Sequence, residues 1–172
     1  MNTVTGIIAV AADGHHSIFL KNNGTVWGCG QNGSGDIGDG TTTDRFSPVQ
    51  VPSLTGITKV ECGLFHSLFL KNDSTVWACG KNAFGTLGNG VYSGSPNPTP
   101  SQVLLTGVID ISGGGEHSLF LKNDSTVWSC GNNQFGQLGI GTSDGNAHPN
   151  PAQVNLLTAV TAVVCGYGHS FF

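Results

Sequence analysis

Histidine followed by serine occurs four times in this sequence, and these two residue types could bind a metal ion or activate a hydroxyl nucleophile. The pairs begin at His16, His66, His117 and His169. A metal ring would need further ligands, and neither an H-x-H spacing nor a third ligand type accompanies the histidines. Catalysis would need the serine beside the imidazole, but adjacent residues of a strand point to opposite faces. We therefore expect structural histidines that satisfy backbone groups between repeats, with no catalytic residue and no metal site.

Five cysteines recur at two positions of the repeated sequence. The first position holds Cys29, Cys79 and Cys130, each two residues after a tryptophan, and the second holds Cys62 and Cys165. An odd number excludes a complete set of internal disulfides, although a Cys62–Cys79 bridge stays open, and the absence of C-x-x-C disfavours zinc. Since Ala12 and Gly113 stand at the second position in other repeats, we expect the cysteines to be small buried side chains.

These residues belong to a sequence motif that is repeated along the chain. It reads HSIFLKNNGTVWGCG from residue 16, HSLFLKNDSTVWACG from 66 and HSLFLKNDSTVWSCG from 117, and a fourth copy begins with HSFF at 169. All differences in repeat length fall in two connections, as is typical of surface loops between packed elements. The sequence predicts a single repeat domain over residues 1–172, with units 6–55, 56–106 and 107–158 and a partial fourth unit 159–172.

Each unit is expected to form about four strands, which in the second unit are residues 57–63, 66–71, 75–80 and 101–105. Leucine and phenylalanine alternate within residues 66–71, so both faces of that strand are apolar. Trp27, Trp77 and Trp128 recur in the third strand as structural residues. Small sheets buried on both faces and repeated about every 50 residues predict an all-β fold, a partial β-propeller of about three four-stranded antiparallel blades.

Turn residues mark the hairpin between the second and third strands. In the first unit the tip is Asn23-Gly24, which predicts a type I′ turn. Ser74 and Ser125 stand in place of the glycine in the next two units. Because serine is disfavoured at positive φ, those two turns are expected to be longer or mildly strained.

A spaced set of residues within each unit carries a family resemblance. In the second unit these residues are His66-Ser67, Leu70, Val76-Trp77, Cys79-Gly80, Asn82, Gly85, Leu87-Gly88 and Gly90. Their pattern resembles the regulator of chromosome condensation repeat, and the phrasing is more similar to bacterial members than to the eukaryotic exchange factor. The resemblance implies a propeller of about seven blades, of which this chain would supply about three.

Members of that family have diverse roles, and the fold does not choose among them. The roles of its members include nucleotide exchange on a small GTPase, ubiquitin-ligase targeting, and bacterial inhibitory or surface binding. In that family the exchange factors use an extra wedge between blades, and a basic tail serves chromatin. Neither feature is visible in this sequence, so those functions are not carried over.

Three blades would leave two apolar flanks uncovered, each large enough to mark an interface. Residues 159–172 repeat residues 6–19, so a ring closed by identical chains would carry one surplus copy at each junction. This favours a piece of a longer propeller over a homo-oligomeric ring, and both explanations stay open.

Composition and charge disfavour several classes of protein. Charged residues make up 9% of the chain, glycine accounts for 27 of 172 residues, and the formal net charge is −4. The basic residues are scattered, which disfavours nucleic-acid binding, and no apolar run is long enough to span a membrane. The sequence GSGDIG from Gly33 is expected to be a turn rather than a phosphate-binding loop. The N-terminus lacks the features of a secretory signal, although a longer parent protein could be secreted or attached to the cell surface.

Residues that differ between units are the candidates for binding. The first set directly precedes the repeated histidines and consists of His15, Leu64, Phe65, Glu116 and Tyr167. The second set lies in variable connections that are expected to be loops, and consists of Arg45, Phe46, Tyr92 and His148. Aromatic residues on the loops of a rigid scaffold are common binding hot spots.

These patterns predict a non-enzymatic β-propeller module that binds a protein partner through its loop faces, without a cofactor, nucleic acid or membrane. The alternative is a structural piece, or a unit of an oligomeric propeller that self-associates through its exposed blade flanks and has no ligand of its own. An exchange-factor-type regulator, or a carbohydrate-binding or enzymatic propeller, is the least supported hypothesis.

Overall fold

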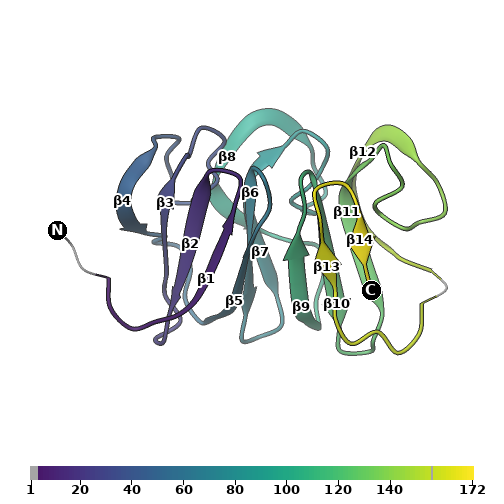
Figure 1. Ribbon diagram of the computed structural model, residues 1–172, viewed down its shortest axis with the longest axis horizontal. Coiled ribbons are helices and arrows are strands. Elements are labelled where there is room, and N and C mark those ends of the chain that lie inside the picture. The colour runs from purple at the N-terminus through teal and green to yellow at the C-terminus, as the bar shows by residue number, and fades with distance from the viewer. Residues whose placement is uncertain (1–3, 156) are drawn as a thin grey trace.

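Short antiparallel sheets make up the described structure. The computed structural model describes residues 4–155 and 157–172, and within these ranges it contains strands and no helix (Figure 1). The first sheet contains β1 (Ile7–Asp13), β2 (His16–Lys21), β3 (Val26–Gly30) and β4 (Arg45–Gln50). The second contains β5 (Ile57–Cys62), β6 (His66–Lys71), β7 (Val76–Asn82) and β8 (Ser93–Gln102). The third contains β9 (Val108–Gly113), β10 (His117–Lys122), β11 (Val127–Asn133) and β12 (Asp144–Gln153), and a final hairpin joins β13 (Val164–Cys165) to β14 (Ser170–Phe171).

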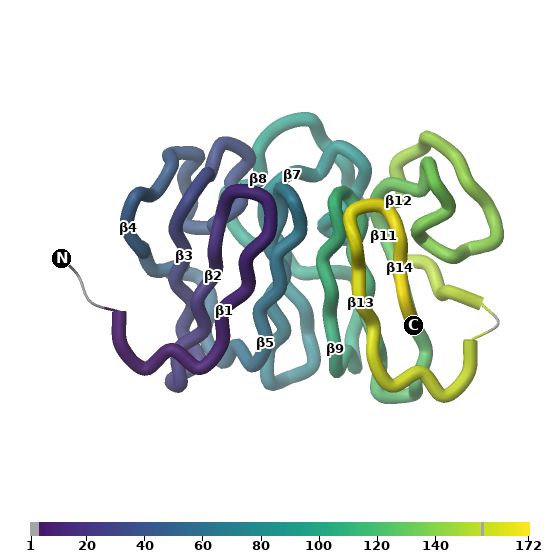
Figure 2. Tube along the Cα trace, in the orientation of Figure 1, coloured from purple at the N-terminus to yellow at the C-terminus, as the bar shows by residue number. Residues whose placement is uncertain are grey.

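The sheets stand side by side as blades. Within each sheet the strands follow chain order, and neighbouring strands are antiparallel. The first strands of successive sheets, β1, β5, β9 and β13, contact one another in turn and lie in a row along the trace (Figure 2). The prediction of an all-β partial β-propeller of about three four-stranded antiparallel blades is confirmed. The unit boundaries 6–55, 56–106, 107–158 and 159–172 stay a prediction.

Each interface between blades has its own apolar core. Between the first and second blades, Ile18 of β2 packs in the same buried cluster as Phe69 of β6. Between the second and third blades, Leu68 of β6 packs in the same cluster as Phe120 of β10. The phenylalanine of each such strand therefore faces the preceding blade, and the aliphatic residues beside it face the following blade. Burial on both faces explains why these strands are apolar throughout rather than alternating.

The turns at the hairpin tips differ from the predicted type I′. That turn needs positive φ at both central residues, and only Gly24 of the Asn23-Gly24 pair has it, with φ of 75°. The amide of Gly24 donates to the carbonyl of Lys21 at 2.9 Å, which gives a type I turn followed by one left-handed residue. Ser74 and Ser125 occupy the same position with φ of 62° and 63°. Their turns are therefore no longer than the first, and they hold serine in a conformation that favours glycine.

The connections expected to be loops are largely strands. β8 and β12 each run for 10 residues in spite of their prolines, so the fourth strand of the second unit lies earlier and is longer than the expected 101–105. Each also bonds to a loop of the preceding blade, because the amide of Asn97 donates to the carbonyl of Ser34 (3.1 Å) and that of His148 to Phe84 (2.9 Å). Proline is tolerated there because these are edge strands of their sheets.

The first blade has an uncovered apolar face. No blade precedes β1 within the described residues, and Val10 of β1 is 59% exposed. The equivalent residues of β5 and β9, Val60 and Ile111, are 5% and 0% exposed because a blade covers them. Phe19 is likewise only half-buried, whereas the equivalent Phe69 is fully buried.

Candidate functional site

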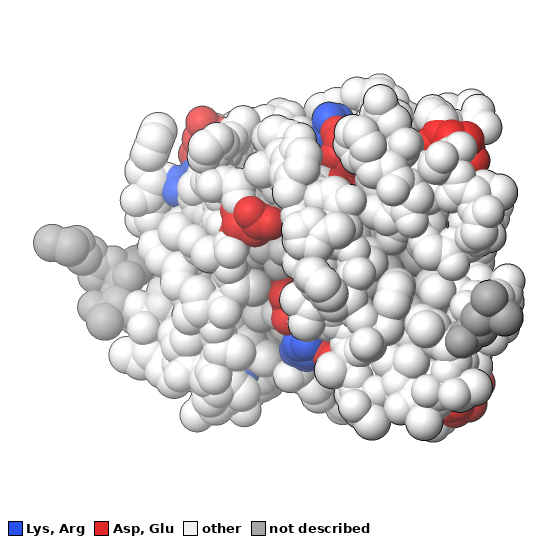
Figure 3. All heavy atoms as spheres, turned by 45° about the vertical axis from the view of Figure 1, so that its right-hand side comes forward, with Lys and Arg blue, Asp and Glu red and all other residues white. Residues whose placement is uncertain are grey.

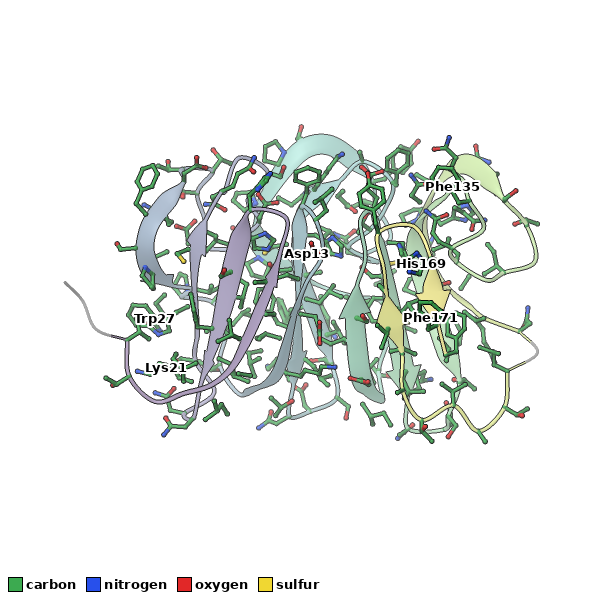
Figure 4. All side chains as sticks on the ribbon, in the orientation of Figure 1. Asp13, Lys21, Trp27, Phe135, His169 and Phe171 are labelled. Carbon is green, nitrogen blue, oxygen red and sulfur yellow. The ribbon has the colours of Figure 1, made fainter. Side chains whose placement is uncertain are left out.

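Hydrogen bonds join the first three repeated histidines to the serine of the following blade or hairpin. The distance from Nε2 to Oγ is 2.9 Å for His16–Ser67, 3.0 Å for His66–Ser118 and 3.0 Å for His117–Ser170. The sequence places each serine directly after its own histidine, whereas the fold pairs it with the histidine one blade earlier. The last histidine, His169, is exposed, and its ring meets Phe171 edge-on at a centroid distance of 5.1 Å (Figure 4).

The serine hydroxyls determine which ring nitrogen carries the proton. Oγ of Ser67 donates to the carbonyl of Asp36 at 2.7 Å, and Oγ of Ser118 donates to the carbonyl of Thr86 at 2.8 Å. Because a hydroxyl has one proton to donate, Nε2–H of the histidine must donate to the serine. An imidazole that donates to a serine cannot also remove its proton, so these buried pairs are not arranged as activated nucleophiles.

Burial keeps these histidines neutral. It lowers the pKa of His16 to about 4, although the nearby Asp13 carboxylate acts in the opposite direction. It lowers the pKa of His66 to about 3, with the neighbouring histidines adding to the effect, and that of His117 to about 4. All three rings are therefore uncharged near neutral pH and act as hydrogen-bond donors between blades.

Asp36 is a buried carboxyl group at the first interface between blades. It is 2% exposed, its Oδ2 accepts a hydrogen bond from the amide of Ser34 at 3.3 Å, and its Oδ1 has no partner. Burial raises the pKa of Asp36 to about 6. Thr86 and Gln137, which are uncharged, occupy the same position in the next two units. A neutral side chain is therefore sufficient at this position, and the ionised carboxylate of Asp36 destabilises the folded chain.

The repeated tryptophans lie at the opposite end of the blades from the histidines. Trp27, Trp77 and Trp128 are half-buried. A lysine of the preceding strand lies over each ring, with Nζ 5.9 Å, 6.0 Å and 5.7 Å from the centroid (Figure 4 labels Lys21 and Trp27). The contact recurs in all three blades, as expected for residues that pack the scaffold.

Both predicted sets of binding residues lie at one end of the blades, the upper end in Figure 1. Gly30 of β3 pairs with His16 on one side and with Arg45 on the other, so the β1–β2 turn is level with the start of β4. We call this end the upper rim; it comprises the turns 13–16, 63–66, 114–117 and 166–169 and the segments 31–45, 81–97 and 132–148.

The upper rim contains a pocket between the third blade and the β13–β14 hairpin. Its volume is about 240 Å³, and its lining is Glu116, Asn132, Gln134, Phe135, Gln137, Tyr167 and Gly168. Phe135 and Tyr167 are 70% and 71% exposed as whole residues, so both aromatic side chains are accessible to a ligand. Figure 4 shows Phe135 on the upper rim above His169.

The structure brings together some residues of the first predicted set. Glu116 and Tyr167 line the pocket, and Phe65 is linked to Glu116 through Lys81. The Lys81 ammonium lies 5.1 Å from the centroid of the Phe65 ring and 2.6 Å from Oε1 of Glu116. The other two members, the exposed His15 and the half-buried Leu64, do not line the pocket.

The second predicted set is spread over three blades and does not form one site. Arg45 forms an ion pair with Asp39 at 2.5 Å, and Phe46 beside it is fully exposed. Tyr92 is 64% exposed on the second blade. Nε2 of His148 on the third blade lies 3.0 Å from a carboxylate oxygen of Asp144.

Phe135 and Asn132 are pocket residues that the sequence analysis did not single out. Phe84 stands at the position of Phe135 in the second unit, so this phenylalanine resembled a structural residue. The available signal is at Asn132, where the preceding units have Gln31 and Lys81. A position that changes charge between otherwise matching units is a candidate for a binding role.

The upper rim holds the excess negative charge of the chain. Its carboxylates are Asp13, Asp36, Asp39, Asp44, Glu116 and Asp144, and its lysine and arginine residues are Arg45 and Lys81. These six carboxylates and two cations account for the whole formal net charge of −4, because the remaining charged residues balance. Acidic side chains are spread along the upper part of the face drawn in Figure 3, with uncharged surface between them.

The structure also places the cysteines. All five are free thiols, so the Cys62–Cys79 bridge does not form, and burial raises the pKa of Cys62 to about 12. Across residues 4–155 and 157–172, no group of three or more histidine, cysteine, aspartate or glutamate residues is placed to hold a metal ion. No helix long and apolar enough to cross a bilayer occurs in the same ranges.

The fold and its repeated contacts define a β-propeller repeat protein. The family model described as the regulator of chromosome condensation (RCC1) repeat matches residues 23–70, 73–121 and 124–172. A second model with the same description matches 7–36, 57–86 and 108–137. Since the matches cover more than half of the chain, it belongs to the RCC1 repeat family. The first model spans two strands of one blade and two of the next, a frame different from the predicted units.

Curated relatives share short stretches with the chain. Alsin from Rattus norvegicus is 40% identical over 65 residues, which are 38% of this chain and 4% of Alsin. The secretion-regulating guanine nucleotide exchange factor from Bos taurus is 35% identical over 57 residues, which are 33% of this chain and 12% of that protein.

A solved structure covers nearly the whole chain. It is Prp20p from Saccharomyces cerevisiae, with a TM-score of 0.83 and 26% identity over 98% of this chain and 44% of that chain. The chain therefore spans less than half of the solved structure that it matches. Alsin, the exchange factor and Prp20p come from rat, cattle and yeast, so the similarity to bacterial members stays a prediction.

Proposed function

We propose that this chain is a non-enzymatic binding module that contacts a protein partner through its upper rim. The observation that carries this proposal is the collection of exposed aromatic and acidic side chains on one end of a scaffold whose strands are nearly identical between blades. Rigid strands with divergent rims are typical of binding proteins, because the scaffold holds the contact residues without a further ordering cost.

The comparisons support a protein as the class of partner. The structure of Prp20p is described with its binding to Gsp1p and histones, which are proteins. The bovine relative is named as an exchange factor. Each of those proteins is longer than this chain, so exchange activity and the identity of their partners are not transferred here.

Site-specific photo-crosslinking tests the proposal. A benzoylphenylalanine is placed at Tyr167, Phe65 or His15 on the upper rim, or at the exposed Asn72 and Asn123 at the opposite end as matched controls. We expect upper-rim positions to capture one discrete partner from cells of the host and the control positions to capture none. Equal capture at both ends, or capture at Asn72 and Asn123 alone, would contradict the proposal.

A second candidate function is self-association through the exposed flanks of the blades. The flank of the first blade carries the residues that a preceding blade covers elsewhere, namely Val10, Phe19 and Ser17. At the other end, Val164 and Phe171 are 55% and 63% exposed. We propose a second copy of the chain as the occupant, because the equivalent surfaces already pack on each other inside one chain.

Light scattering over a range of protein concentrations tests self-association. We expect the mass to rise with concentration and to return to that of a single chain in a Val10→Lys variant, since a lysine would be buried without a partner. A Thr58→Lys variant, on an exposed position of β5, is the control. A wild-type mass that stays at one chain throughout would overturn this candidate without affecting the first.

A further inference from the structure

We propose that the pocket lined by Glu116, Phe135 and Tyr167 binds a lysine or arginine side chain of the protein partner. This inference rests on the proposed function and names the chemistry of one contact. It goes beyond that function because it specifies a cationic group, a position between two blades and the residues that select it.

Two aromatic rings and one carboxylate form the walls that a cation would meet. Phe135 and Tyr167 are each about 70% exposed, and Glu116 lies at the pocket lining with them. Aromatic faces attract lysine and arginine through the ring quadrupole, and the attraction strengthens where water is excluded. A carboxylate in the same pocket adds a charge-assisted hydrogen bond and selects against neutral side chains of equal length.

One blade earlier, the chain places a cation of its own at the position that corresponds to Asn132. There the ammonium of Lys81 lies over the ring of Phe65 and donates to Oε1 of Glu116 at 2.6 Å. Lys81 and Asn132 are equivalent residues of β7 and β11. At the later interface an uncharged amide therefore stands where the earlier interface supplies its own cation.

The two carboxylate oxygens of Glu116 accept hydrogen bonds from different blades. Oε1 accepts from Lys81, and Oε2 accepts from the neutral Nδ2 of Asn132 at 3.1 Å. The pocket lining contains no lysine or arginine. Together with the negative charge of the upper rim, this leaves the pocket side of Glu116 without a cationic partner and favours one from outside.

Titration with capped tripeptides tests the proposal on the whole chain. The probes are Gly-Lys-Gly, Gly-Arg-Gly and Gly-norleucine-Gly, each acetylated and amidated, and the readout is the backbone amide NMR shifts. We expect the lysine and arginine peptides to shift residues 132–137 and 167–168, with the norleucine peptide binding about tenfold more weakly. Equal binding of all three peptides, or shifts at other residues only, would overturn the proposal.

Variants separate the pocket from the rest of the rim. Asn132→Lys should abolish binding of the lysine peptide because the chain then fills the pocket with its own cation, as Lys81 does one blade earlier. Gln31→Lys, the equivalent change in the first unit, adds the same charge away from the pocket and should leave binding unchanged. If Asn132→Lys lowers stability, Tyr167→Ala tests the same point at an exposed position, and unchanged binding in that variant would contradict the proposal.

The outcomes distinguish this inference from the proposed function. Upper-rim crosslinks to a partner without selective binding of cationic peptides would reject the pocket chemistry and retain the interaction surface. The absence of both would reject both proposals.

Discussion

Lowering the pH from 7 to 5 is expected to reduce the free energy of unfolding of this chain by about 4 kcal/mol. His16, His66 and His117 have pKa values lowered to about 4, about 3 and about 4 by burial. In the unfolded chain they take up protons near the ordinary value of about 6.5. The unfolded state therefore binds more protons between these limits, so stability is fully present above pH 6.5 and is lost as the pH falls. Each histidine contributes a loss of about 2 kcal/mol by pH 5.

Asp36 acts in the opposite direction over part of the same range. Its pKa is raised to about 6 in the folded chain, so the folded state binds the extra proton and is stabilised as the pH falls below that value. The gain by pH 5 is about 1 kcal/mol, which is smaller than the loss from the three histidines. The net effect of acid is therefore destabilising.

Denaturant unfolding at a series of pH values measures this balance. The slope of unfolding free energy against pH near pH 5 should correspond to about two protons in the native sequence and about three in Asp36→Asn. Asp36→Asn should also be more stable at pH 7 by about 2 kcal/mol, since it removes an ionised carboxylate from a buried site. Asn72→Gln, at an exposed residue without a titrating side chain, is the control and should leave the slope unchanged. A slope near zero in the native sequence would show that the repeated histidines are not buried between blades.

Replacing Phe69 by alanine is expected to lower the free energy of unfolding by about 3–5 kcal/mol, the usual range for a buried phenylalanine. Its side chain is 0% exposed in the cluster between the first and second blades. Phe120 is buried in the same way one blade later, and its replacement should have a similar effect. The loss combines the removed apolar contacts with the cavity that rigid neighbouring strands cannot fill.

Phe19→Ala provides a matched control at the equivalent position of the first blade. Phe19 is half-buried because no blade covers it within the described residues, so its replacement should reduce stability by only about 1 kcal/mol. Unfolding of the three variants at low protein concentration makes the comparison. An equal decrease in the free energy of unfolding for Phe19→Ala and Phe69→Ala in a single chain would contradict the assignment of covered and uncovered faces.

The repeated sequence motif is sufficient to predict the blades because its apolar residues determine which strand faces must be buried. Apolar residues on both faces of residues 66–71 require cover on both sides, and a repeat of that strand supplies it. Turn chemistry was less reliable. Asn-Gly favours type I′ in isolation, but the same loop accepts serine in the next two units, which suits a single left-handed position after a type I turn.

Contacts between blades are the feature of the fold that the sequence does not predict. The pairing of His66 with Ser118 depends on how far one sheet is offset from the next, and local patterns carry no information about that offset. Most of β8 and β12 lies in segments that the sequence predicts to be loops, because proline and glycine normally interrupt strands. They are strands because backbone partners lie on both sides, in their own sheet and in the preceding blade.

The candidate site could be predicted only in part, because it lies between two blades and depends on how they pack. Glu116 and Tyr167 were identified because they differ from their equivalents in other units, and they line the pocket. Phe135 was missed because a phenylalanine stands at the same position in the second unit. Phe135 is 70% exposed, whereas Phe84 is half-buried and its carbonyl accepts a hydrogen bond from the amide of His148 in the following blade. This difference is a tertiary feature rather than a property of the repeat.

The most direct test of the blade arrangement is an NMR titration of the His66 ring nitrogens in the folded chain. The structure predicts a neutral ring with the proton on Nε2, a through-space contact from that proton to Ser118, and no protonation as the pH is lowered from 7 toward 5 while the chain remains folded. A ring that carries its proton on Nδ1 would contradict the account. So would a ring that gains a second proton with a midpoint at pH about 6.5, the value for a solvent-exposed histidine.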